Sequence, residues 1–66
     1  MKNWIIVKAS RVPSRATVAN AYGGPTAKTA GVQPAKVYSN REEAQNDAVK
    51  LSQMNPCGFL VLEVVE

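Results

Sequence analysis

The sequence predicts a small α+β domain of two layers, in which one helix packs on one face of a three-stranded antiparallel sheet. Three patterns predict it: strand-forming residues cluster near both ends of the chain, a helix-capping pattern lies between them, and alanines recur at helical spacing. With 66 residues the chain makes a single domain, residues 1–66, close to the lower size limit for folding without a disulfide or a metal.

The expected order of elements is β-loop-β-α-β. The first strand is predicted over residues 3–9, where Trp, Ile and Val residues have high strand propensity. Residues 10–35 are rich in Ala, Thr, Ser, Gly and Pro, which predicts a long basic loop with a helical turn within residues 16–22. A short second strand is expected at residues 36–38 and a third at residues 58–65, and the simplest sheet places the first strand between these two.

The helix is the most clearly marked element. Ser39 and Glu42 match the capping box, in which a serine and a glutamate three residues later bond to each other's free backbone amides. The helix should run to about Met54, because Pro56 cannot continue it. Its inner stripe has helical spacing and consists of Ala44, Ala48 and Leu51.

Alternation along the strands assigns their side chains to two faces. The sets without charge are expected to meet the helix: Ile5, Val7, Ala9, Val37, Leu60, Leu62 and Val64. The other sets would form an open apolar face around Trp4, Tyr38 and Phe59, and such a face is typical of an interaction site. Two alternatives remain: a second copy of the chain covers this face, or the long loop folds over it. Residues that could form that cover are Val12, Val18, Tyr22 and Val32.

Charge is divided unevenly along the chain. Residues 1–41 have a net charge of +7 with no acid, whereas residues 42–66 have a net charge of −4. This asymmetry favours a polyanion or an acidic protein surface as partner, and the simpler interpretation is an unevenly charged, solvated surface. The residues predicted to contact a partner are Trp4, Lys8, Arg11, Arg15, Lys28, Lys36, Tyr38 and Phe59.

Few residues could support catalysis or hold a cofactor. The chain has no histidine, and its one cysteine, Cys57, allows neither an internal disulfide nor a thiolate cluster. Residues 21–28 contain two glycines but lack the spacing of a phosphate-binding loop, so a turn is expected there. We therefore expect a non-enzymatic protein without metal or cofactor. The lone thiol and the short apolar runs predict a soluble, cytoplasmic protein without a membrane segment.

The second half of the chain resembles a family of phage proteins. The residues that carry the resemblance are Val37-Tyr38-Ser39-Asn40-Arg41-Glu42-Glu43-Ala44, Ala48, Pro56-Cys57-Gly58-Phe59-Leu60-Val61 and Val64. This pattern is similar to that of the small host-RNA-polymerase inhibitors of lytic podophages, and it also resembles other compact phage proteins such as anti-CRISPR proteins. In the polymerase inhibitors basic residues end the last strand, whereas here Glu63 and Glu66 do. The resemblance thus implies an inhibitor acting by occlusion in the host cytoplasm, and leaves its target open.

The leading hypothesis is a non-enzymatic inhibitor that binds a host protein or nucleoprotein complex, of the anti-CRISPR or RNA polymerase inhibitor type, through its basic loop and open sheet face. One alternative is a single-stranded nucleic-acid-binding module that stacks bases on Trp4, Tyr38 and Phe59 beside the neighbouring lysines. Another is a structural or assembly subunit that donates its sheet edge to a neighbour. A homodimer is compatible with all three.

Overall fold

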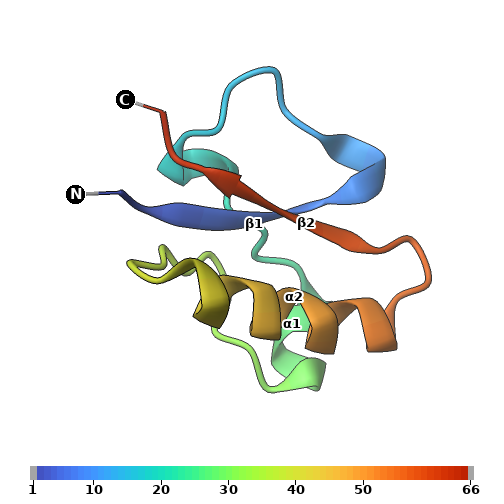
Figure 1. Ribbon diagram of the computed structural model, residues 1–66. Coiled ribbons are helices and arrows are strands. Elements are labelled where there is room, and N and C mark those ends of the chain that lie inside the picture. The colour runs from blue at the N-terminus through green and yellow to red at the C-terminus, as the bar shows by residue number, and fades with distance from the viewer. Residues whose placement is uncertain (1, 66) are drawn as a thin grey trace.

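A two-stranded antiparallel sheet lies at the centre of the computed structural model, which describes residues 2–65. Strand β1 (Trp4–Lys8) pairs with β2 (Phe59–Glu63) in a register that places Ile6 opposite Val61. Helices lie below this sheet in Figure 1, and the segment that follows β1 passes above it. The fold is therefore α+β, with the sheet covered on both sides.

The predicted strand at residues 36–38 is reduced to one isolated bridge. Trp4 and Tyr38 exchange two backbone hydrogen bonds of 2.8 Å, so β1 does lie between β2 and this segment. Pairing extends no further because Ala35 before it has a positive φ of 54° and Asn40 after it already caps a helix. The prediction of a third strand is not confirmed among the described residues.

The long helix α2 spans Arg41–Met54, and its predicted end is confirmed. Its N-cap is Asn40 and not the predicted Ser39: the Asn40 side-chain oxygen accepts from the backbone N–H groups of Glu42 and Glu43, at 2.8 and 3.4 Å. An asparagine caps as well as a serine, and the first turn then begins one residue later. The stripe of Ala44, Ala48 and Leu51 is buried as predicted.

Residues 9–35 are more ordered than a loop. They contain two short 3₁₀ helices, η1 (Ala9–Arg11) and η2 (Val18–Asn20), and the helix α1 (Pro25–Ala30). The η2 helix lies within residues 16–22, where a helical turn was expected. Tyr22 anchors the segment to the sheet, since its N–H donates to the Ile6 carbonyl and its own carbonyl accepts from Ala35, both at 2.8 Å. Helix α1 packs against α2, so the segment covers both sides of the sheet.

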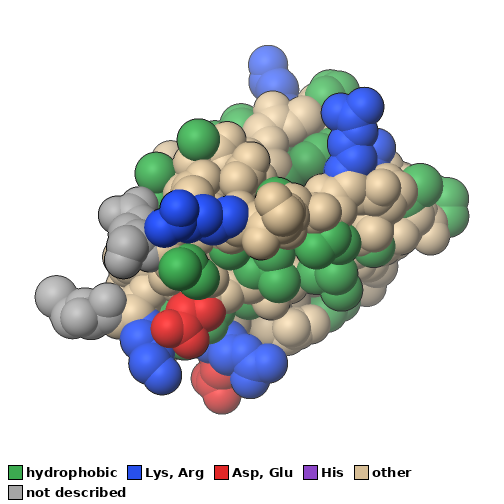
Figure 2. Space-filling model, turned by 90° about the horizontal axis from the view of Figure 1, so that it is seen from above, with side chains coloured by type: hydrophobic (Ala, Val, Ile, Leu, Met, Phe, Trp, Pro, Cys, Tyr) green, Lys and Arg blue, Asp and Glu red, His purple; other side chains and the backbone are tan. Residues whose placement is uncertain are grey.

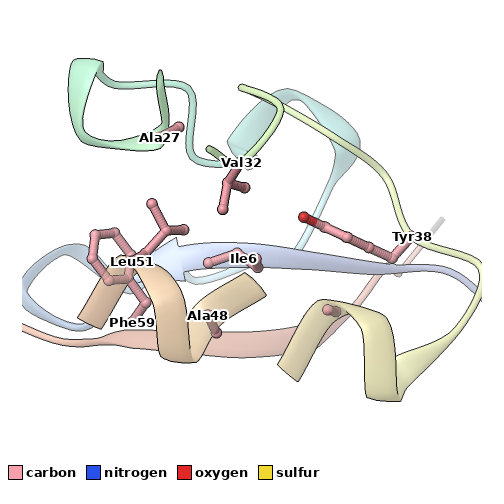
Figure 3. Close-up of a cluster of buried hydrophobic side chains, with 8 residues drawn as sticks. Ile6, Ala27, Val32, Tyr38, Ala48, Leu51 and Phe59 are labelled. Atoms are coloured by element: carbon pink, nitrogen blue, oxygen red, sulfur yellow. The ribbon is translucent and has the colours of Figure 1, made fainter. Parts of the chain in front are cut away.

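Two clusters of buried side chains lie on opposite faces of the sheet. Ile6, Tyr38 and Phe59 pack with the alanines and Leu51 of α2, and with Ala27 and Val32 from the α1 region (Figure 3). On the other face Ile5 and Val7 pack with Ala16, Ala21, Leu62 and Val64.

Within residues 2–65 no helix is both long and apolar enough to cross a membrane.

The face assignment made from the sequence is therefore wrong. The helix covers the set that contains Ile6, Tyr38 and Phe59, and the set that contains Ile5, Val7 and Leu62 meets the segment after β1. Val37, expected to point inward, is exposed. The charges used for the assignment, Lys8 and Glu63, end their strands, where they reach solvent from either face.

Candidate binding surface

The predicted aromatic platform is part of the hydrophobic core. Tyr38 and Phe59 are only 2 % and 9 % exposed, and the half-buried Trp4 packs against the same cluster. Phe59 makes an edge-to-face contact with Tyr22, with ring centroids 4.9 Å apart at an angle of 65°. The Tyr38 and Phe59 rings pack in the cluster under α2 and cannot stack bases, so the burial of these two rings contradicts the open aromatic platform predicted for nucleic acid.

Tyr38 instead forms a polar contact that the sequence did not predict. Its hydroxyl donates a hydrogen bond to the Asp47 carboxylate of α2. Burial, this hydrogen bond and the negative charges of Asp47 and Glu43 all raise the pKa of Tyr38 above its ordinary value. Asp47 comes one residue before the buried Ala48, and this position at the border of the helix's inner stripe was the signal available in the sequence.

The predicted basic residues fall on different parts of the fold. Lys8 ends β1, Arg11 ends η1, and Arg15 is exposed in the turn between η1 and η2. Lys28 is exposed on α1, on the side of the sheet that carries α2. The Lys36 ammonium lies 4.8 Å from the centroid of the Tyr38 ring, where it makes a cation–π contact. The structure therefore does not gather residues 10–35 into one basic surface.

Lys8 and Arg11 do line a common open hollow. Its volume is about 610 Å³, and the other residues around it include Asn20, Tyr22 and the Gly23-Gly24-Pro25 run. The hollow forms because the chain leaves β1 through η1 and returns to β1 at Tyr22. The segment above the sheet is tied together by Asn20, whose side-chain amide donates to the Arg15 carbonyl at 2.8 Å and to the Thr17 hydroxyl at 3.1 Å.

We call residues 8–21, which carry Lys8, Arg11 and Arg15, the basic layer. Among the described residues, the ion pairs join Lys2 to Glu63 at 4.0 Å and Lys50 to Asp47 at 3.8 Å, so no basic side chain of this layer has an acidic partner within 4.0 Å. Figure 2 looks down on this side of the molecule: lysine and arginine side chains are spread over it, and acidic side chains appear only at one edge.

The basic layer also exposes aliphatic side chains. Val12 is 51 % and Val18 46 % exposed, and both flank the arginines in sequence. Aliphatic groups beside arginines suit the surface of another protein, whereas bases would require exposed aromatic rings for stacking. Among residues 2–65 no three His, Cys, Asp or Glu side chains are placed to bind a metal ion together.

No protein-family model, curated protein or solved structure significantly matches the chain. The similarity to phage inhibitors therefore stays a prediction, and the candidate surface is argued from the chain's own geometry.

Proposed function

We propose that this protein is a non-enzymatic binding module whose basic layer contacts an acidic surface of a partner protein. The observation that carries the proposal is that the basic layer holds positive charge without any acid. The acids Glu42, Glu43 and Asp47 lie on α2, where Arg41 and Lys50 accompany them, whereas the basic layer contains no acid. Unbalanced positive charge directs this face of the molecule toward negative potential and speeds encounter with an acidic partner.

The type of partner follows from two further features. Exposed Val12 and Val18 next to the arginines favour a protein over a bare nucleic acid. The resemblance of residues 37–66 to phage inhibitors supports a target among host nucleic-acid-handling or defence complexes, such as an RNA polymerase or a CRISPR effector. In this role the module inhibits by occupying an acidic surface or a site where nucleic acid would lie.

Affinity capture with matched charge variants tests the proposal. The wild type, an Arg11→Glu/Arg15→Glu variant and an Arg41→Glu/Lys50→Glu variant are used to capture proteins from a nuclease-treated bacterial lysate. Both variants lower the net charge by the same amount, but the second changes only α2. We expect the first variant to lose the captured protein and the second to retain it, because rim charges act locally at an interface.

Two outcomes would count against the proposal. Equal recovery by all three proteins would show that the basic layer is not the contact. The second outcome comes from titration with labelled single-stranded RNA and DNA. Tight binding that depends steeply on salt concentration would favour nucleic acid as the partner.

A further inference from the structure

The outer edge of β2 has backbone groups without partners. In an antiparallel pair, alternate residues direct their N–H and C=O groups toward the neighbouring strand. The Ala9 N–H donates to Gly58 and the Val64 N–H to Asn3, at 3.1 and 2.7 Å, so the even-numbered residues 58–64 face β1. Phe59, Val61 and Glu63 therefore direct their backbone groups away from β1, and within residues 2–65 no hydrogen bond reaches them.

Most of the opposite edge of the sheet, along β1, is closed. On the far side of β1, Tyr38 pairs with Trp4, and the Tyr22 N–H donates to the Ile6 carbonyl. Beyond the end of β2, the Val65 N–H donates to the Ala16 carbonyl at 2.7 Å. The longest run of unpaired outward backbone groups is thus on β2. In Figure 1, β2 is the nearer strand, and no other segment crosses in front of it.

This edge has little of the protection that exposed strands usually have, since its one charged side chain is Glu63 at its end. Edge strands are commonly protected by a lysine, a proline or a bulge. β2 reads Phe-Leu-Val-Leu-Glu, and its register with β1 continues through every residue without a bulge. Leu60, the second residue of this strand, is 42 % exposed. The edge therefore combines free hydrogen-bonding groups with exposed apolar area.

We infer that β2 of one copy of the chain pairs with β2 of a second copy, forming a four-stranded antiparallel sheet. A two-fold axis at Val61 places Val61 opposite its own copy and Phe59 opposite Glu63, so all the outward backbone groups find partners. Leu60 points to the face of the sheet opposite to Val61. In this register it lies opposite Leu62 of the second copy, and the contact between the two leucines buries Leu60. Glu63 meets no like charge in this register. The strand is thus complementary to itself in hydrogen bonding, hydrophobicity and charge, which favours a second copy over an unrelated peptide.

Matched variants test this inference by measurement of molecular mass in solution. Leu60→Lys places a charge on the proposed interface, and Val12→Lys makes the same change at a similarly exposed residue away from it. Val61→Pro removes an N–H that only the second copy would bond, and leaves the bonds to β1 intact. The masses are measured by analytical ultracentrifugation up to about 1 mM protein. A reductant is present so that the exposed Cys57 forms no crosslink.

The wild type and Val12→Lys are expected to double in mass as concentration rises. Leu60→Lys should weaken the dimer by about tenfold or more, since two symmetric Leu60–Leu62 contacts are lost. Val61→Pro should remain a monomer with an unchanged circular dichroism spectrum. A wild type that is monomeric over the whole range overturns the inference, as does a Leu60→Lys variant that dimerises as well as Val12→Lys.

Discussion

The hydrogen bond between Tyr38 and Asp47 should make the stability of the fold fall as the pH rises into the alkaline range. Replacing Tyr38 by phenylalanine removes only the hydroxyl and keeps the buried ring. A hydrogen bond to a charged acceptor contributes about 1.5–3 kcal/mol, and the partly exposed Asp47 can regain water, so we expect a loss of about 1.5 kcal/mol at pH 7.

The sign of the pH effect follows from the raised pKa of Tyr38. The unfolded chain releases this proton at about pH 10, whereas the folded chain retains it to higher pH. The stabilisation is fully present below pH 10 and is lost as the pH rises further, by about 1.4 kcal/mol per pH unit. The wild-type advantage over Tyr38→Phe should therefore vanish at about pH 11.

Urea unfolding between pH 7 and pH 11, followed by the fluorescence of the half-buried Trp4, measures this difference. Tyr22→Phe is the control, because the Tyr22 hydroxyl makes no hydrogen bond to another residue among those described, and this variant should keep the wild-type slope. The reasoning is refuted if the difference in the free energy of unfolding between wild type and Tyr38→Phe stays constant up to pH 11.

Two further predictions concern the start of α2 and the turn between α2 and β2, and both can be measured by the same urea unfolding at pH 7. Asn40→Ala should destabilise the protein by about 1 kcal/mol, because the side chain that caps two backbone N–H groups is lost. Ser39→Ala is the control and should change stability by under about 0.5 kcal/mol. A larger loss for Ser39→Ala than for Asn40→Ala would identify Ser39 as the cap. Gly58→Ala should lower the free energy of unfolding by about 1 kcal/mol, because Gly58 has a φ of 80°, which alanine adopts only with strain. Gly23→Ala is the control and should be nearly neutral, because the added Cβ would lie at an ordinary contact distance of 3.5 Å from Ala35. Equal losses of stability in the two variants would contradict this backbone argument.

The helix was predictable because its signals are local. Cap, acidic first turn, alanine stripe and proline stop all lie within a few residues of the structure they determine. The one error, Ser39 in place of Asn40, arose because two adjacent residues can both cap, and only the path of the chain from Tyr38 decides between them.

The faces of the sheet were not predictable from charge, because both faces are buried and therefore both are apolar. Size would have been the better guide. Ala44 and Ala48 leave room on the helix's inner face, and the large rings of Tyr38 and Phe59 fill it. Small residues on a helix thus indicate the strand face that carries the largest side chains.

The path of residues 9–35 depends on contacts between distant parts of the chain. The bonds from Tyr22 to Ile6 and from Val65 to Ala16 join backbone groups, which carry no sequence signal of their own. For this reason the sequence identified Lys8 and Arg11 as basic but could not show that they share a hollow, or that Lys28 lies on the other side of the sheet.

The basic layer and the open edge of β2 are separate surfaces, and pairing at the edge would change what the layer can do. A two-fold axis through Val61 perpendicular to the sheet keeps equivalent faces on the same side. Two basic layers would then lie side by side, with both α2 helices on the opposite face. Two linked contacts bind a repeated acidic surface more tightly than either contact alone. Leu60→Lys should therefore weaken binding to such a partner although it adds a positive charge. Val49→Lys adds the same charge at an exposed residue of α2, outside both surfaces, and should preserve the avidity.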